Sequence, residues 1–415
     1  MRMIQIGNKQ SISSMPTGSG LHPGWPELLG YMHAQPAIKR SRSIRLLLTG
    51  ALLLCTFFVE AQKASDPLAT PEARRLYAGL ERLGKTYTLF GHQDALAYGV
   101  GWKGVNGNSD VKIVTGDYPA VYGWDLGHLE LDSSRNLDGI PFNRMRDYIR
   151  QGYDREAVIT ISWHLRNPVN LKSAWDTTPG SVKAILPGGA KHEVFKSWLD
   201  KLAGYLSSLK GSNGKSIPVL FRPFHEFTGN WFWWCRNVCT PEEFIALWRF
   251  TVHYLRDVKQ LHQLLFVYNT AEFKDAADFL LRYPGDDVVD VLSFDMYQHG
   301  GGDKRAAFTN EARRRLTIIC ELAKEKKKIA AFAETGYEAI PDAAWWTEVL
   351  LPALRGLPVA WVLVWRNHGY KAWEKSMHHY APYKGHLSSA DFIKFFNDPQ
   401  MMFERKLRAQ HIYRH

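Results

Sequence analysis

Short apolar runs alternate with amphipathic stretches along most of the chain after residue 62. Eight of these runs are rich in Val, Ile, Leu and Phe with little polar alternation, which is typical of parallel strands covered on both faces. We expect strands at Thr88–Gly91, Ala120–Trp124, Ala157–Trp163, Val219–Arg222, Leu264–Tyr268, Val291–Asp295, Ile329–Ala333 and Trp361–Trp365. Eight strands that alternate with helices over roughly 350 residues predict an α/β fold, a (β/α)8 TIM barrel forming one domain over residues 62–415.

Between the strands, apolar residues recur with the 3.6-residue period of a helix. One stripe consists of Val194, Trp198, Leu202, Tyr205, Leu206 and Leu209, and another of Phe244, Leu247, Trp248, Thr251 and Leu255. Thr240 followed by Pro241 predicts the start of the second helix, because Thr caps a helix and Pro fits its first turn. A doubly wound open sheet is the alternative fold, but no Gly-rich phosphate loop follows an early strand.

Polar and ionisable residues gather where the predicted strands end. They are His92, Gln93 and Asp94, then Asp125, His164, His225, Glu226 and Asn269, and finally Asp295, Tyr297, Glu334, Arg366, Asn367 and His368. In a barrel, the C-terminal ends of all strands meet at one rim, where active sites are built. We therefore expect a site at this rim.

Two of the strand ends carry a glutamate in apolar surroundings. Glu226 follows the fourth strand within the segment FRPFHEFTGNWFWW, and Glu334 follows the seventh. These strands lie on opposite sides of a barrel mouth, so the two carboxylates can converge over a ligand. Carboxylates about 5 Å apart suit retaining glycoside hydrolysis. For a single strand-end glutamate an ion pair with an arginine is an equally good explanation, but the pair favours catalysis.

The segment from Arg222 to Trp234 closely resembles the motif of glycoside hydrolase family 26, the family of barrel glycosidases that contains β-mannanases. Most members of the wider clan have Asn before the acid/base glutamate, whereas this family has His, as at position 225. The resemblance covers about residues 85–370, through Gly91–Gln93, Trp163–His164, Phe294–Tyr297, Glu334–Gly336 and Trp365–Asn367.

Carried over position by position, the resemblance implies Glu226 as the acid/base and Glu334 as the nucleophile. It implies a substrate-binding set of His164, His225, Trp231, Tyr297, Trp365, Arg366, Trp163 and Arg222. Tyr297 would hydrogen-bond the nucleophile, Trp365 would form a sugar platform, and Arg366 would reach the −2 mannose. Arg222 would support the carboxylates from below. From the pattern alone, Trp233 and Trp234 are either sugar platforms or packing.

The implied activity is that of a secreted retaining β-1,4-mannanase acting on mannan, glucomannan or galactomannan, either within chains or by releasing mannobiose. A high aromatic content, 13% with 15 Trp, suits a sugar-binding partner such as a β-mannan polysaccharide or oligosaccharide. Carboxylates and water suffice for this chemistry, so no cofactor or metal is expected. The alternatives are a mixed-linkage β-glucanase, a β-1,3-xylanase or a non-catalytic glycan-binding barrel.

The formal net charge of +11 comes from scattered basic residues. The one basic run, Lys324 to Lys328, fits a helix end, where cations favour the dipole. No helix-turn-helix, zinc-finger or RNA-binding pattern accompanies these charges, so we expect no nucleic-acid partner. We expect the chain to act as a monomer.

Residues 1–61 are predicted to be an N-terminal extension and a signal peptide. Basic residues, Lys39, Arg40, Arg42 and Arg45, precede the apolar run from Leu46 to Val59, and Ala61 ends a small-residue cleavage site. The apolar run is too short for a membrane span, so the mature chain is expected to have none. We expect export to the periplasm, the cell surface or the medium. Initiation at Met32 and lipidation at Cys55 stay open.

The remaining three cysteines lie in the predicted barrel. Cys235 and Cys239 are four residues apart in a polar loop and form a candidate disulfide for an oxidising compartment. A zinc site there would need two further ligands. Cys320 lies in an apolar helix stripe, which predicts a buried thiol.

Overall fold

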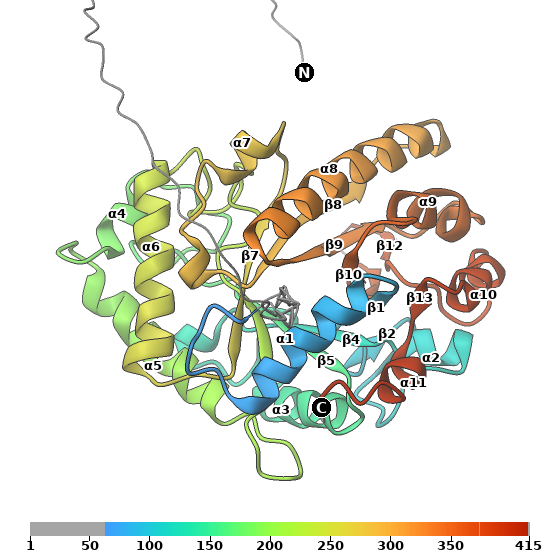
Figure 1. The fold of residues 1–415 in the computed structure, drawn as a ribbon, viewed down its shortest axis with the longest axis horizontal. Coiled ribbons are helices and arrows are strands. Elements are labelled where there is room, and N and C mark those ends of the chain that lie inside the picture. Colours follow the sequence, from blue (N-terminus) through green and yellow to red (C-terminus); the bar gives the residue numbers. More distant parts are fainter. Residues whose placement is uncertain (1–62, 373, 414–415) are drawn as a thin grey trace, which may run out of the picture. The chain divides into compact units, whose positions relative to one another are not determined.

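A closed barrel of eight parallel strands forms the centre of the computed structural model, which describes residues 63–372 and 374–413 (Figure 1). Each strand pairs with the next along the chain, and the last pairs with the first, so the sheet closes. The strands are β1 Thr88–Gln93, β4 Val121–Asp125, β5 Val158–Ser162, β6 Val219–Arg222, β7 Leu264–Thr270, β8 Val291–Gln298, β9 Ile329–Tyr337 and β10 Val359–Val364. The predicted (β/α)8 fold and its eight strands are confirmed.

Helices surround the barrel (Figure 1). They are α1 Pro71–Gly84, α2 Asp110–Thr115, α3 Phe142–Asp154, α4 Ser181–Ile185, α5 His192–Ser207, α6 Pro241–His253, α7 Ala276–Leu280, α8 Arg305–Lys326, α9 Leu351–Leu354, α10 Ser389–Asn397 and α11 Glu404–Arg408. In the described residues, no helix is long and apolar enough to cross a membrane. The basic run ends α8, as predicted, with Lys327 in the left-handed conformation at its C-cap.

Five short strands lie outside the barrel wall. β2 Tyr98–Gly99 and β3 Trp102–Lys103 form one hairpin, and β11 Gly369–Lys371 and β12 Ser376–His378 form another. β13 Met401–Met402 pairs with β1 in parallel. The two hairpins follow β1 and β10, so they belong to the rim at which these strands end.

Local sequence accounts for the start of α6. The Thr240 hydroxyl accepts a hydrogen bond from the Glu243 backbone N–H at 3.2 Å, and the Glu243 carboxylate accepts one from the Thr240 N–H at 3.1 Å. This capping box satisfies two backbone donors that the helix leaves unpaired. Phe244, Leu247 and Trp248 then face the core, as the apolar stripe predicts.

A β-bulge between β8 and β9 places two acidic residues side by side. Phe294 pairs with Phe332, but Asp295 pairs with Glu334, so Ala333 is the extra residue on β9. A bulge bends its strand and re-aims the following side chains, and bulges occur often beside active sites. The carboxylates of Asp295 and Glu334 therefore reach the same rim from neighbouring strands.

Both ends of the described chain lie at the opposite end of the barrel from this rim. Near the start, the Ser65 backbone N–H donates to Asp290 at 2.6 Å, and Asp290 directly precedes β8. Near the end, the Tyr413 hydroxyl donates to the carbonyl of Ala157 at 3.0 Å, just before β5. The predicted signal peptide, its cleavage site at Ala61 and the possible lipidation at Cys55 fall outside the described residues.

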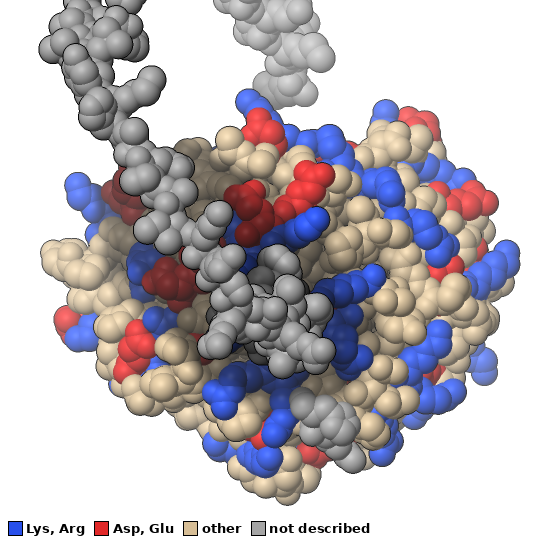
Figure 2. Space-filling view, in the orientation of Figure 1, with Lys and Arg blue, Asp and Glu red and all other residues tan. Residues whose placement is uncertain are grey.

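Charged residues are mixed over the face of the molecule drawn in Figure 2. Lys and Arg are spread among Asp and Glu on the part of that face where described residues are visible.

Candidate active site

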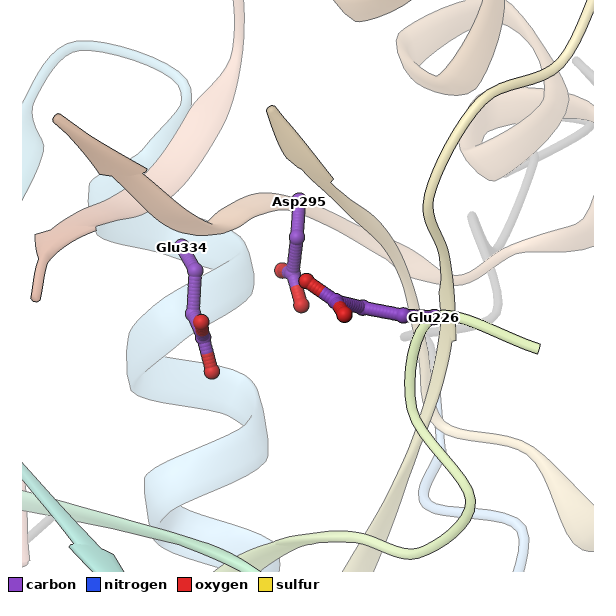
Figure 3. Close-up of side chains that lie close together, drawn as sticks. All are labelled: Glu226, Asp295 and Glu334. Atoms are coloured by element: carbon purple, nitrogen blue, oxygen red, sulfur yellow. The ribbon is translucent and has the colours of Figure 1, made fainter. Parts of the chain in front are cut away.

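Three carboxylates converge at the C-terminal rim of the barrel (Figure 3). Glu226 lies in the turn after β6, Asp295 is on β8 and Glu334 is on β9. One oxygen from each carboxylate lies within 4.8 Å of the other two. The structure thus brings Glu226 and Glu334 together, and it adds Asp295, whose place in the cluster the sequence analysis did not foresee.

The backbone at Glu226 is held in an unusual conformation. Glu226 has φ 56° and Phe224 has φ 50°, both in the left-handed region that non-glycine residues rarely adopt. Such a conformation costs about 1–2 kcal/mol per residue and occurs often at functional sites. The Glu226 N–H donates to the Asn269 carbonyl at 2.9 Å, and its carbonyl accepts from the Gly229 N–H at 2.8 Å. These bonds fix the direction in which the Glu226 side chain leaves the turn.

The environment of Glu226 favours its protonated form. Burial, and after it the neighbouring Glu334 carboxylate, raise the pKa of Glu226 to about 7. The Trp231 indole N–H donates to Glu226 Oε2 at 2.7 Å, which opposes part of this rise. A carboxyl group with such a pKa can give up a proton near neutral pH.

Two donors orient the Glu334 carboxylate. The Tyr297 hydroxyl donates to Oε2 at 2.7 Å, and the Arg222 guanidinium pairs with Oε1. Arg222 also donates to Asp295 Oδ2 at 2.8 Å, so one guanidinium bridges two carboxylates. Burial opposes the charge of Arg222, but Glu334 and Asp295 raise its pKa above the ordinary value. Arg222 therefore supports the carboxylates, as the resemblance implied.

The same three carboxylates are the one group among the described residues whose geometry could hold a metal ion. Arg222 contacts two of them and supplies a fixed positive charge there. Burial raises the pKa of Asp295 well above its usual range, while Arg222 opposes that rise. The cluster is therefore organised around a guanidinium.

A pair of buried histidines lies beside the carboxylates. His164 Nδ1 is 2.7 Å from Asp125 Oδ2, and its Nε2 is 3.1 Å from His225 Nε2. Burial disfavours the charged form of His164, but Asp125 outweighs it and raises the pKa. Burial, His164 and Arg222 together hold the pKa of His225 well below its usual range. Asp125 therefore favours the charged form of His164, whereas the surroundings of His225 favour its neutral form.

Aromatic side chains line the open part of the site. Trp231 and Tyr297 border a cleft of about 430 Å³ together with Glu226. Trp175 borders the same cleft, is 52% exposed and stacks on His164 with ring centroids 5.3 Å apart. Trp365 is half-buried, with its ring edge-on to His164 at 6.5 Å. Sequence reasoning missed Trp175, because it lies in a loop with no motif.

Three other tryptophans lie behind the cleft surface. Trp163 was expected to bind substrate, but it is fully buried and its indole donates to Glu130 at 3.1 Å. Trp163 directly follows β5, and its side chain packs into the core while that of the next residue, His164, borders the carboxylates. That expectation is wrong in this structure. Trp233 and Trp234 are also fully buried, which decides between the two earlier explanations in favour of packing.

Arg366 is held by acidic and phenolic partners that the sequence did not reveal. Its Nη1 lies 3.1 Å from Asp138 Oδ1 and 3.5 Å from the Tyr98 hydroxyl. Tyr98 in turn hydrogen-bonds Asp94, which follows β1. Burial opposes the charge on Arg366, but Asp138 raises its pKa above the ordinary value. These partners come from the segments after β1 and β4, far from Arg366 in the sequence, so no local motif links them to it.

The candidate disulfide between Cys235 and Cys239 is absent from this structure, where both are buried free thiols. The Cys235 thiol donates to the Glu226 carbonyl at 3.4 Å. The Cys239 thiol faces the carbonyls of Trp234 and Cys235, at 3.6 and 3.7 Å. Each sulfur has its own carbonyl partner, so hydrogen bonds close the loop that a disulfide was expected to close. Cys320 is buried, as predicted.

A parallel barrel whose rim brings two glutamates within 4.8 Å of each other, one of them with a raised pKa, has the arrangement of the carboxylate-pair glycoside hydrolases. The model of glycosyl hydrolase family 26 matches residues 65–379, and the chain belongs to that family.

Solved structures of the family are similar in both sequence and fold. A family 26 β-mannanase from Bacteroides ovatus is 43% identical with a TM-score of 0.77, over 82% of this chain and 97% of that one. An endo-β-1,4-mannanase from Cellulomonas fimi is 33% identical with a TM-score of 0.73, over 83% of this chain and 78% of that one.

Curated relatives carry additional length. A mannan endo-1,4-beta-mannosidase from Bifidobacterium adolescentis is 32% identical over 360 residues, which is 82% of this chain and 35% of that protein. One from Thermothelomyces thermophilus is 29% identical over 67% of this chain and 53% of that protein. The chain therefore spans about a third to a half of these two relatives.

Proposed function

We propose that this protein is a retaining β-1,4-mannanase that hydrolyses mannan, glucomannan or galactomannan. The observation that carries the proposal is the approach of Glu226 and Glu334 to within 4.8 Å, with a pKa of about 7 at Glu226. This spacing suits a direct attack by one carboxylate, because inverting enzymes keep the two groups about 6.5–9.5 Å apart to admit a water molecule. The mannanases among its relatives favour mannan as the substrate.

In the first step, a Glu334 oxygen forms a bond to the anomeric carbon at the −1 subsite while the glycosidic C–O bond breaks. Glu226 gives its proton to the leaving oxygen, so the departing sugar leaves as a neutral alcohol. The Tyr297 and Arg222 donors hold the Glu334 carboxylate in a fixed orientation for this attack. Preorganised orientation of this kind lowers the entropic cost of the reaction.

In the second step, Glu226 is a carboxylate and acts as a base. It takes a proton from water, the water oxygen bonds to the anomeric carbon, and the bond to Glu334 breaks. The product keeps the original configuration, and Glu226 again carries a proton. The two glutamates and one water molecule thus account for every bond and proton in the two steps.

The remaining rim residues have positions suited to sugar binding. Trp365 presents a ring next to the buried His164–His225 pair, and pyranose faces stack on such rings. Arg366, fixed by Asp138, is the proposed contact to the −2 mannose. Trp231 both borders the cleft and bonds Glu226.

The pKa of Glu226 predicts the alkaline side of the pH–activity profile. The first step needs the protonated acid, so the protonated fraction and kcat/KM both fall as pH rises through about 7. In a Glu226→Gln variant the side chain is an amide that does not titrate, so the remaining low activity is expected to lack that alkaline limb. Initial rates on mannotetraose between pH 4 and about 9 measure this. An unchanged alkaline limb in Glu226→Gln would assign the titration to another group.

Substrate choice is tested with purified protein on linear β-1,4-mannan, lichenan and β-1,3-xylan. We expect hydrolysis of mannan, with the β-anomer of the new reducing end formed first. Activity only on lichenan or β-1,3-xylan would support the alternative β-glycanases, and binding without turnover would support a non-catalytic barrel. Products from mannohexaose then separate the two modes of action, because mannobiose and mannotetraose as the only early products, followed by mannobiose alone, indicate release from chain ends.

We also propose that the protein is exported. The basic and apolar segments between Lys39 and Ala61 support this, because they have the order of a signal peptide. N-terminal sequencing of the mature protein tests it, and Gln62 is the expected first residue.

A further inference from the structure

Three consecutive residues bond to three consecutive carbonyls that surround the acid/base. The Trp234 indole N–H donates to the His225 carbonyl at 2.8 Å. The Cys235 thiol donates to the Glu226 carbonyl at 3.4 Å, and the Arg236 backbone N–H donates to the Phe227 carbonyl at 2.8 Å. We call residues 234–236 the clamp. It restrains every carbonyl from the residue before Glu226 to the residue after it.

The clamp is itself built into the fold. The Trp234 and Cys235 side chains are fully buried. The Cys235 sulfur also accepts the Phe232 N–H at 3.4 Å, so this thiol connects two backbone segments. On the far side, the Arg282 guanidinium donates to the Cys239 carbonyl at 2.8 Å, which anchors the end of the loop. The clamp is therefore a fixed support.

The backbone conformation of Glu226 needs support from the surrounding structure. The residue is in the left-handed region, where a side chain of this kind is not stable by local preference alone. Its carboxylate meets the indole of Trp231, which begins the loop that carries the clamp. One loop thus holds both the backbone and the carboxylate of the acid/base.

We propose that Trp234 and Cys235 are positioning residues for the acid/base Glu226. They touch neither the substrate nor the reacting atoms, and they act by holding the carbonyls of His225 and Glu226. Loss of the Trp234 donor removes its bond to the His225 carbonyl, and loss of the Cys235 thiol leaves the Glu226 carbonyl with the Gly229 N–H. Either change loosens the turn and moves the acid away from the glycosidic oxygen. The inference rests on the proposed function, since it assumes that Glu226 protonates a leaving group.

The leaving group provides a readout that a purely structural role would not affect. A sugar leaving group needs a proton, whereas dinitrophenolate leaves readily without one. The ratio of kcat/KM on mannotetraose to kcat/KM on 2,4-dinitrophenyl β-mannobioside therefore reports the placement of the acid. This parameter covers the first step only, so the later role of Glu226 as a base does not contribute.

The test variants remove one donor each. Trp234→Phe keeps an aromatic ring but loses the indole N–H, and Cys235→Ala loses the thiol. We expect kcat/KM on mannotetraose to fall by about 10- to 100-fold in each, because small displacements of a catalytic group have effects of this size. On the dinitrophenyl substrate we expect a change of less than about threefold. Cys235→Ser keeps a donor and is expected to recover most of the loss.

Matched controls remove the same groups elsewhere. Trp248 is a fully buried tryptophan on α6 whose indole donates to the Val288 carbonyl at 3.0 Å, and Cys320 is a buried thiol on α8. Trp248→Phe and Cys320→Ala are expected to leave the ratio unchanged.

Two results overturn the inference while leaving the proposed function intact. One is an equal loss on both substrates in Trp234→Phe and Cys235→Ala, and the other is no loss on either. If the unmodified protein hydrolyses neither substrate, the proposed function fails first. If one variant does not fold, the other is judged alone, because each donor is predicted to act on its own carbonyl.

Discussion

Replacing Glu334 by Gln is expected to lower kcat on mannotetraose by roughly 10⁴-fold or more, as removal of a nucleophile does in other enzymes. The neutral amide fills the same space but cannot form the covalent bond to the anomeric carbon. The dinitrophenyl substrate is expected to suffer the same loss, because the nucleophile is needed whichever group departs. Arg222 can still donate to the amide oxygen, and the Tyr297 hydroxyl can accept from the amide N–H, so the fold is expected to survive.

Glu338→Gln is the matched control for this variant. Glu338 lies just past the end of β9, is exposed and pairs with His378 at 2.6 Å. The same chemical change there is expected to leave kcat within about twofold of the unmodified protein, because Gln keeps an amide oxygen that can bond to His378. If Glu334→Gln kept turnover within tenfold, the nucleophile would have to be another group, and Asp295 would be the first candidate.

Glu226→Ala is expected to separate the two substrates. On mannotetraose, kcat/KM should fall by about 10²- to 10⁴-fold, the usual contribution of a general acid. On dinitrophenyl mannobioside the first step should remain fast, and the covalent intermediate should then accumulate because no base activates water. Mass spectrometry of the intact protein can detect that intermediate as an added mannobiosyl group.

Added azide gives a second check on the same variant. A small anion can occupy the space left by the carboxylate and attack the intermediate without a base, so a β-mannobiosyl azide is expected. Glu272→Ala is the control, because Glu272 is an exposed glutamate that borders the same cleft. Equal losses on both substrates in Glu226→Ala would exclude Glu226 as the acid.

The barrel could be predicted because each wall strand is buried on both faces. Val219–Arg222 and Leu264–Thr270 are buried throughout, so their apolar runs stand out from the amphipathic helices between them. The capped start of α6 was equally clear, because Thr240 and Pro241 act within one turn. Local signals were therefore sufficient for the elements and, with the rule for strand ends, for the rim.

Pairings across the rim could not be predicted in the same way. Asp125 and His164 are 39 residues apart, and Arg366 and Asp138 belong to different loops. Their contacts depend on the register of the barrel strands and on the paths of the loops, and the sequence around these residues contains no signal for either. The bulge at Ala333 is a similar case, since it sets the direction of Glu334 but cannot be recognised in AFAETG.

The predictions for Trp163 and for the Cys235–Cys239 disulfide were wrong for a related reason. The resemblance supplied Trp163 together with His164, but just past the end of β5 the Trp163 side chain turns into the core and bonds to Glu130. The spacing of Cys235 and Cys239 was compatible with a disulfide. The direction of each thiol, toward separate carbonyls, follows from the loop conformation rather than from the spacing.

The contacts of Ser65 with Asp290 and of Tyr413 with Ala157 have a practical consequence for how this molecule is handled. A resin, an affinity tag or an accessory module joined at either end would be attached at the end of the barrel opposite the candidate active site. Long polymer chains would then approach the mouth without steric interference from the attachment. Preparations immobilised through either end are therefore expected to stay active on soluble polysaccharide.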